Sequence, residues 1–152
     1  MNVRPLAANE VEFVDEHLPL NRLDQFHRGS SCYLVAWDAE TPVGHAHLAW
    51  PSAELREPEL PELQDVYVVA ERRREGIASA LTAAAEHEAK ANGFARLMLS
   101  FGAGNDAARL LYERAGYRDA GLDPVRVAGT ILIRGKPMEV DDTLVYLVKS
   151  LA

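Results

Sequence analysis

A basic, glycine-containing turn is the first segment of this sequence whose residue types suggest chemistry. Residues 73–78 read RREGIA and follow residues 65–69, which are apolar and β-branched enough to predict a buried strand. A helical pattern begins at Ile77. A glycine at a helix start lets unpaired backbone N–H groups approach a ligand closely, at the positive end of the helix dipole. The turn therefore suits a phosphate or pyrophosphate, with a solvated charged turn as the alternative.

A second segment of interest follows the next predicted strand, residues 94–101. Residues 105–117 read NDAARLLYERAGY and predict a helix over 107–115, with Asn105 or Asp106 as its N-cap and Gly116 after its end. This helix carries Tyr112. The tyrosine could pack on the sheet with its hydroxyl as a satisfied polar tip, or the hydroxyl could reach a ligand.

Together the two segments resemble the motifs of the GNAT superfamily of N-acetyltransferases. Residues 73–78 match R-x-x-G-x-A, and residues 105–117 match N-x-x-A-x-x-L-Y-x-x-x-G-Y. The resemblance covers about residues 2–150. It implies an α/β fold with a mixed, mostly antiparallel central sheet of six to seven strands and about four flanking helices. It also implies that the fourth and fifth strands splay apart.

The same resemblance implies acetyl-CoA as co-substrate, with its pyrophosphate on backbone N–H groups of residues 74–79. The pantetheine arm would take the place of a strand partner along residues 66–68, and the Val68 N–H would stabilise an oxyanion. Tyr112 would act as general acid toward the departing thiolate. The implied cofactor contacts are Val66, Tyr67, Val68, Arg73, Arg74, Glu75, Gly76, Ile77, Ala78, Ser79, Asn105 and Tyr112. Asn105 could equally be a plain helix cap.

The general base is less defined, because an attacking amine must lose a proton to some group. Some members of the superfamily place a glutamate five residues before the motif asparagine, where this sequence has Ser100. Glu62 or Asp65, at the start of the fourth strand, could act through water. His45 and His47 share one face of a predicted strand and could also reach the site. They lack an evident third ligand, so we expect no metal.

Composition limits the number of domains, the kinds of partner and the location that we expect for this protein. The chain has 152 residues, which predicts one domain over residues 1–152. Its net charge of −7 argues against a nucleic-acid partner or an anionic membrane surface. We find no apolar targeting or membrane-spanning stretch and expect a cytoplasmic protein. The partner would be a small-molecule or peptide amine, and a homodimer is compatible with the family. An acidic set before the site would attract a cationic amine or simply be solvated: Glu54, Glu57, Glu59, Glu62 and Asp65.

The rest of the chain predicts strands interleaved with short helices. Near the N-terminus we expect a strand over 1–6, a helix over 8–18 capped by Asn9, a helix over 21–28, strands over 33–37 and 43–50, and a loop over 51–61. Further on we expect a helix over 77–91, a strand over 122–127, a loop over 129–137 and a last strand over 143–148.

Three functions remain open from the sequence. The first is transfer of acetyl from acetyl-CoA to a primary amine by direct attack in a ternary complex. The second is a non-catalytic acyl-CoA-binding sensor or partner module of the same fold. A remote third is an NAD-binding oxidoreductase, because residues 102–107 also match the dinucleotide pattern G-x-G-x-x-A.

Overall fold

A computed structural model describes residues 1–51, 60–133 and 136–151 of the chain. The predicted loop over 51–61, with Glu54, Glu57 and Glu59, lies almost wholly outside these described residues. The elements, with η for a 3-10 helix, are β1 (Asn2–Pro5), η1 (Ala8–Glu10), α1 (Val11–His17), α2 (Leu23–His27), β2 (Ser31–Asp38), β3 (Thr41–Ala49), β4 (Glu62–Val68), η2 (Ala70–Arg72), α3 (Ile77–Ala91), β5 (Arg96–Gly102), α4 (Asp106–Arg114), β6 (Arg118–Asp119), β7 (Val125–Ile133) and β8 (Lys136–Ser150).

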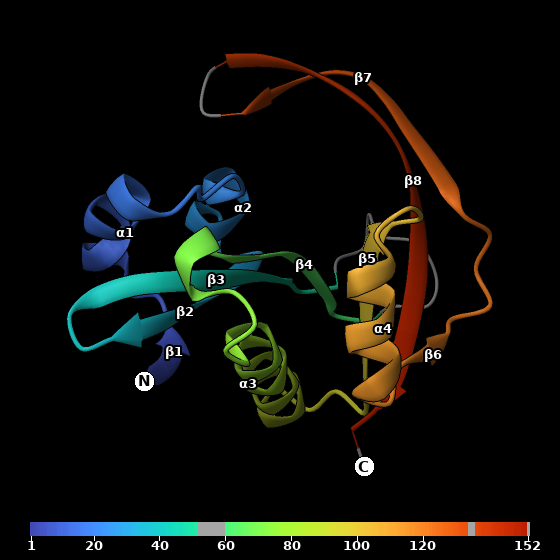
Figure 1. Ribbon diagram of the computed structural model, residues 1–152, viewed down its shortest axis with the longest axis horizontal. Helices are drawn as coiled ribbons and strands as arrows, with labels where there is room; N and C mark the ends of the chain where they lie inside the picture. Colours follow the sequence, from blue (N-terminus) through green and yellow to red (C-terminus); the bar gives the residue numbers. More distant parts are fainter. Residues whose placement is uncertain (52–59, 134–135, 152) are drawn as a thin grey trace.

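The strands form one mixed sheet in the order β1-β2-β3-β4-β5-β8-β6, and β7 pairs with β8 outside this path. Every pairing is antiparallel except that of β4 with β5. Only two residue pairs join these two strands, Glu62 with Met98 and Leu63 with Leu99. Beyond Leu63 the strands diverge (Figure 1). The mixed, splayed sheet therefore confirms the expected fold.

A β-bulge lies in β4 just after this last pairing. The register with β3 passes from His47 opposite Gln64 to His45 opposite Tyr67, so two residues of β4 oppose one of β3. Within the bulge Asp65 has a φ of 51°, which is rare for a residue with a side chain. A bulge bends its strand and increases the local twist. Here the bend begins where β4 leaves β5.

Helices cover both faces of the β2–β4 part of the sheet (Figure 1). The buried apolar stripe of α3 consists of Ile77, Leu81, Ala85 and Ala89, spaced by four residues, and Thr82 is buried beside it. These small alanines let the helix pack closely on the sheet. On the opposite face, α1 and α2 pack on the alternate side chains of β2, which include Tyr33, Val35 and Trp37.

The first helical segment is shorter than predicted, and the expected Asn9 cap is wrong. Residues 8–10 form the 3-10 turn η1, and the α-helix starts at Val11. The Glu10 carboxylate accepts a hydrogen bond from the Ala7 N–H at 3.0 Å and binds the Arg4 guanidinium through both oxygens. This carboxylate satisfies a donor ahead of the turn, and the structure shows no capping hydrogen bond from Asn9.

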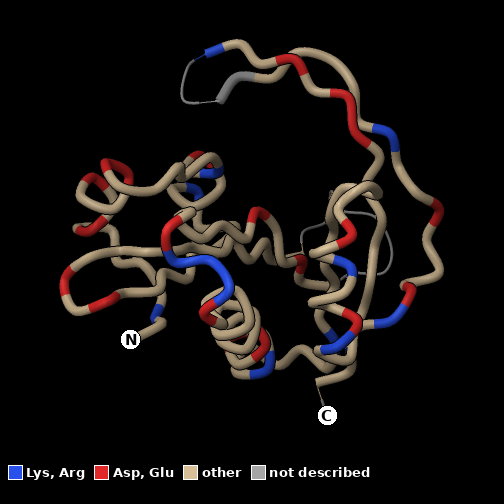
Figure 2. The backbone as a smooth tube through the Cα atoms, in the orientation of Figure 1, with Lys and Arg blue, Asp and Glu red and all other residues tan. Residues whose placement is uncertain are grey.

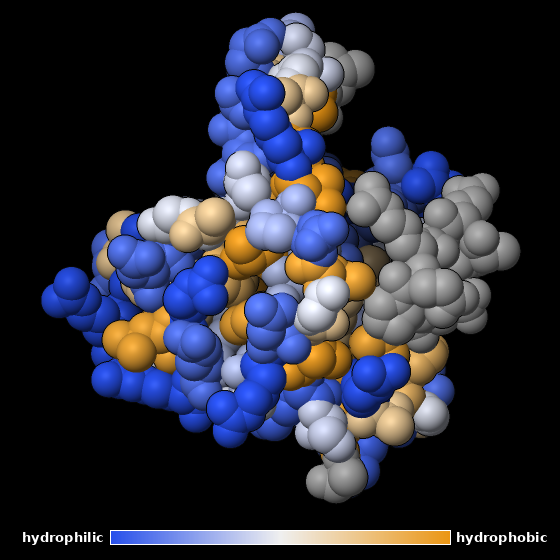
Figure 3. Space-filling view, turned by 90° about the vertical axis from the view of Figure 1, so that its right-hand side faces the viewer, coloured by the Kyte–Doolittle hydropathy of each residue, from blue (hydrophilic) through white to orange (hydrophobic). Residues whose placement is uncertain are grey.

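The predicted loop over 129–137 is also wrong. Here β7 and β8 form a long hairpin, paired from Val125–Leu144 to Ile133–Lys136, which raises the strand number of the sheet to eight. Gly129 and Pro137 suggested a break, but both are tolerated at a sheet edge. The hairpin projects from the body of the molecule (Figure 1). In Figure 3 it stands at the top, with hydrophilic residues along one side and some hydrophobic residues on the other.

Gly44 in β3 offers a test of the close packing of α3. A Cβ at Gly44 would lie 2.9 Å from the Tyr67 carbonyl oxygen and 3.3 Å from side-chain atoms of both Ile77 and Leu81. We expect Gly44→Ala to lower the free energy of unfolding by about 1–3 kcal/mol, as overpacking does. The measurement is urea denaturation. Gly104→Ala is the control, because a Cβ there meets nothing within 4 Å. Equal stabilities of the two variants would contradict this account.

Candidate active site

A cleft of about 530 Å³ lies between β4, the start of α3 and α4. It is lined by every residue that the sequence predicts to contact the cofactor except Glu75, which instead pairs with Arg72 at 2.9 Å. The two predicted motifs therefore face the same space. The sequence did not indicate four further lining residues, which are Arg72, Ala107, Ala108 and Leu111.

One end of the cleft has the features that favour an anion. Gly76 is the N-cap of α3, and no side chain caps this helix terminus. Both Gly76, at a φ of 85°, and Arg74, at 66°, adopt left-handed backbone conformations. The N–H groups of Ile77, Ala78 and Ser79 lie in the first turn, where a helix supplies no backbone acceptor. Unpaired donors at the positive end of a helix dipole favour a phosphate group.

The three consecutive arginines, residues 72–74, differ in their contacts. They form a continuous basic stretch just before α3 (Figure 2). Arg72 binds Asp38 at 2.6 Å as well as Glu75, and the Nε of Arg73 donates to the Val68 carbonyl at 3.0 Å. Arg74 forms no ion pair with a described residue, so its charge remains available to a ligand.

The middle of the cleft exposes one edge of β4. The Val69 N–H donates to the Val43 carbonyl of β3 at 3.0 Å. Successive N–H groups along a strand point to opposite edges, so the Val68 N–H points away from β3. On that side β5 has already diverged, and Val66, Tyr67 and Val68 line the cleft. The strand therefore presents a free backbone donor at the predicted position.

Tyr112 lies in α4 on the opposite wall, and its side chain is only 6% exposed. Its ring packs against Phe101 and Tyr117, with centroids 5.9 and 6.0 Å apart. Burial raises the pKa of the Tyr112 hydroxyl to about 12, so the group is protonated at neutral pH and can donate a hydrogen bond. Asn105 caps α4 by accepting from the Ala108 N–H at 3.0 Å, and its amide nitrogen remains free to contact a ligand.

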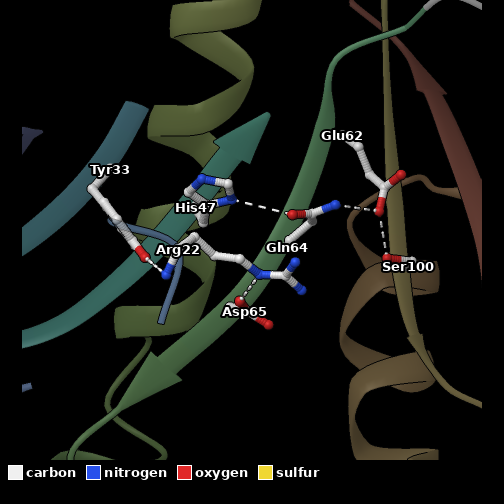
Figure 4. A network of polar contacts seen from close by, with 7 residues as sticks. All are labelled: Arg22, Tyr33, His47, Glu62, Gln64, Asp65 and Ser100. Atoms are coloured by element: carbon white, nitrogen blue, oxygen red, sulfur yellow. Dashed lines mark hydrogen bonds and ion pairs between the residues drawn. The ribbon is translucent and has the colours of Figure 1, made fainter. Parts of the chain in front are cut away.

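The two candidate carboxylates differ in their partners (Figure 4). Asp65, on the bulge, accepts from the Arg22 Nε at 2.7 Å. Glu62 accepts two hydrogen bonds on Oε2, from the Ser100 hydroxyl at 2.7 Å and the Gln64 amide at 2.9 Å. By the resemblance described above, Ser100 occupies the position where some members of the superfamily have a glutamate. The carboxylate of Glu62 thus reaches that position from the neighbouring strand.

Both candidate histidines lie in the interior of the protein. His45 is 2% exposed and His47 fully buried, and burial lowers the pKa of each to about 4. They are therefore neutral at pH 7. His45 lines a smaller cavity of about 230 Å³ that also borders Asp65, Val66 and Tyr67. Among the described residues there is no cluster of three or more metal-binding side chains.

The comparison with protein families decides the classification. The model of the acetyltransferase (GNAT) family matches residues 3–117. The chain belongs to this family. No curated protein matches the sequence. In this GNAT chain the dinucleotide-like pattern at residues 102–107 opens α4, but the strand that follows, β6, has two residues and pairs with β8 and not with β5, so the adjacent parallel strands of a dinucleotide-binding unit do not form there.

Solved structures share the fold at low identity. A ribosomal-protein-alanine N-acetyltransferase from Brucella melitensis has 20% identity and a TM-score of 0.70, over 99% of both chains. A Bacillus subtilis acetyltransferase in complex with CoA has 16% identity and a TM-score of 0.71, over 99% of both chains. A GNAT family acetyltransferase from Elizabethkingia anophelis with acetyl-CoA bound has 16% identity and a TM-score of 0.69, over 98% of this chain and 97% of its own. No described helix of the present chain is long and apolar enough to span a membrane.

The buried histidines predict a pH-dependent stability. Each has a folded-state pKa of about 4, below the reference value of 6.5, so the unfolded chain binds more protons between these pH values. The free energy of unfolding should therefore fall as the pH drops below 6.5, by about 1.4 kcal/mol for each histidine at pH 5.5. Urea denaturation at pH 7.5, 6.5 and 5.5 measures this slope. His47→Asn should flatten it, whereas His87→Asn, at an exposed position on α3, should not; equal slopes would contradict the prediction.

Proposed function

We propose that this GNAT protein transfers an acetyl group from acetyl-CoA to a primary amine, by direct attack within a ternary complex. The observation that supports this most is the single cleft that joins an anion-binding helix terminus, a free strand edge and Tyr112. Family membership supports acetyl transfer in general. The bound molecules named for two structural neighbours, acetyl-CoA and CoA, support the choice of co-substrate.

The cofactor would lie along the cleft from α3 to β4. Its pyrophosphate would accept hydrogen bonds from the first N–H groups of α3, beside the unpaired Arg74. The pantetheine arm would pair with the edge of β4 at Val66, Tyr67 and Val68, where β5 is absent. The Val68 N–H would then face the thioester oxygen, and one such donor contributes about 3 kcal/mol to an oxyanion-like transition state. The Asn105 amide would contact the pantetheine directly or through water.

In the reaction, the amine nitrogen attacks the thioester carbon, the carbon–sulfur bond breaks and CoA leaves as a thiolate. Before the attack, the ammonium form of the amine gives one proton to Glu62 through a water molecule, and the nitrogen loses a second proton as the amide forms. Asp65 is the second candidate for this role, but its carboxylate is already paired with Arg22. Glu62 forms no ion pair with a described residue, and it lies beside Ser100, at the position where some members of the family have a glutamate. These contacts favour Glu62.

Tyr112 would assist the departure of the thiolate. With its pKa near 12, full proton transfer to a thiolate of cysteine-like pKa, near 8.5, would be uphill by about 5 kcal/mol. Tyr112 therefore acts chiefly through a hydrogen bond that strengthens as negative charge develops on sulfur. The proton that finally neutralises the thiolate can be relayed from the attacking amine.

The alternative is a GNAT-fold module that binds acyl-CoA without turnover. Isothermal titration with acetyl-CoA, run beside a thiol-release assay, separates the two. The amine panel should include spermidine, free amino acids and a peptide with an N-terminal alanine. We expect binding together with thiol release that depends on one of these amines. Binding without turnover would support the sensor, and no binding would contradict both functions.

The anion-binding turn can be tested with two glycines at opposite ends of α3. Gly76 and Gly93 both have φ values near 85–89°, and a Cβ at either meets nothing within 4 Å. Alanine at each should cost about 1 kcal/mol of stability through backbone strain. Only Gly76→Ala should weaken CoA binding, by about tenfold, because it disturbs the N–H groups that face the phosphates. Calorimetric titration with CoA measures this effect, and equal affinities of the two variants would reject the site.

Tyr112→Phe tests the general acid. We expect kcat to fall about tenfold or more because a donor to the leaving sulfur is lost. The dissociation constant of acetyl-CoA should change by less than about twofold, because the ring still packs in place. Tyr117→Phe is the matched control: it removes the 2.8 Å hydrogen bond to Glu86, and because neither of these residues lines the cleft, kcat should stay unchanged. Wild-type turnover by Tyr112→Phe would remove Tyr112 from this role.

A further inference from the structure

Four polar side chains form a continuous hydrogen-bonded chain across the gap between β4 and β5 (Figure 4). His47 of β3 contacts the Gln64 Oε1 of β4 through Nδ1 at 3.2 Å. The Gln64 Nε2 donates to Glu62 Oε2 at 2.9 Å, and the Ser100 hydroxyl of β5 donates to the same oxygen at 2.7 Å. Three strands therefore contribute to one carboxylate.

The donors in this chain all point toward Glu62. An ionised carboxylate only accepts hydrogen bonds, so Ser100 and the nitrogen of the Gln64 amide must be the donors. The amide oxygen of Gln64 then faces His47, which must carry its proton on Nδ1. Burial keeps the His47 ring neutral, with its pKa near 4, so the ring has a single proton, and its contact with Gln64 requires that proton on Nδ1. The Nε2 atom of His47 has no partner among the described residues.

We propose that Ser100, Gln64 and His47 are positioning residues that hold the Glu62 carboxylate as the general base of the acetyl transfer. This inference rests on the function proposed above. Both donors occupy Oε2, which leaves Oε1 without a hydrogen bond to a described residue. Oε1 is therefore the atom that accepts the proton from the amine through water. His47 acts at a distance, by fixing which end of the Gln64 amide faces the carboxylate.

The partners of Glu62 favour this role over a purely structural one. A half-buried carboxylate that serves only stability is usually paired with a cation, as Asp65 is with Arg22. Among the described residues Glu62 is hydrogen-bonded to neutral donors alone, and Arg22, which is paired with Asp65, acts on its charge only through space and without an ion-pair contact. An orienting shell of neutral hydrogen bonds around a carboxylate that has no direct ion pair is what a base for an ammonium group requires.

The first experiment compares matched substitutions in the network. Ser100→Ala and His47→Leu each remove a donor, whereas Ser100→Thr and His47→Asn keep a hydroxyl or an N–H at that position. We expect kcat to fall about tenfold or more in the first pair, because the carboxylate is no longer held in place, and to recover largely in the second. The affinity for acetyl-CoA should stay unchanged in all four. Wild-type kcat in both Ser100→Ala and His47→Leu would overturn the proposal.

The second experiment measures the pH dependence of kcat/KM. This pH profile should stay the same if Glu62 and its partners had a merely structural role. Gln64→Glu places a second carboxylate in contact with Glu62, and two such carboxylates share a proton. The acidic limb of the profile should therefore move to higher pH by about one unit or more. An unmoved limb in a folded variant that still turns over would show that Glu62 is not the group that titrates in catalysis.

The third experiment moves the carboxylate across the gap. Glu62→Ser should lower kcat about a hundredfold or more. Because the Ser100 oxygen is 2.7 Å from Glu62 Oε2, the double variant Glu62→Ser with Ser100→Glu brings a carboxylate back to the same place. We expect it to regain at least about tenfold of the lost activity. No recovery in a double variant that still binds acetyl-CoA would contradict the assigned position of the base.

A readout without turnover separates this inference from the proposed function. Nitrogen-15 NMR of the wild-type protein should show His47 protonated on Nδ1, and protonation on Nε2 would overturn the directed network whether or not the protein is active. If the wild type acetylates none of the amines, the proposed function fails and the base role fails with it. If the wild type turns over and the network variants match it, only the positioning role fails.

Discussion

The divergence of β4 from β5 is the constraint on which the rest of this structure depends. After two residue pairs the strands separate, and the bulge at Asp65 bends β4 away. A strand edge in the middle of a sheet carries N–H and C=O groups that need partners. Here that edge borders a cleft rather than another strand. An extended ligand with amide groups can satisfy the edge, which is the physical basis for placing pantetheine there.

The same divergence separates two kinds of polar group. At one end of the cleft, the N-terminus of α3 and Arg74 carry positive charge, and in the proposed function they would face the phosphates of acetyl-CoA. At the base of the gap lies the carboxylate of Glu62, which is the base that we propose for the incoming amine. In the proposed function, the donor and the acceptor of the acetyl group would therefore meet surfaces of opposite sign, and they would meet each other at the free edge of β4.

Burial keeps the key hydrogen-bond donors uncharged. It raises the pKa of Tyr112 and lowers that of His47, so both side chains are neutral at physiological pH and each has one defined proton to donate. At low pH the same burial lowers the free energy of unfolding. His45 and His47 bind protons at a higher pH in the unfolded chain than in the folded one, so acid favours the unfolded chain. The polar interior that serves the site thus makes the fold sensitive to acid.

Local signals in the sequence determined the elements that carry the motifs. The sequence predicts the starts of α3 and α4 to within a residue. The signals are Gly76, which precedes an alanine-rich stripe, and Asn105, which caps α4; both are local because a cap and its helix are contiguous in the chain. The tertiary structure alone decided that Glu62 meets Ser100 across the gap and that the tail forms the β7–β8 hairpin. Those pairings join residues far apart in sequence, and no local pattern specifies which strand edge a residue will face. Gly129 and Pro137, which indicate a loop locally, are accommodated because the pairing of β7 with β8 outweighs them.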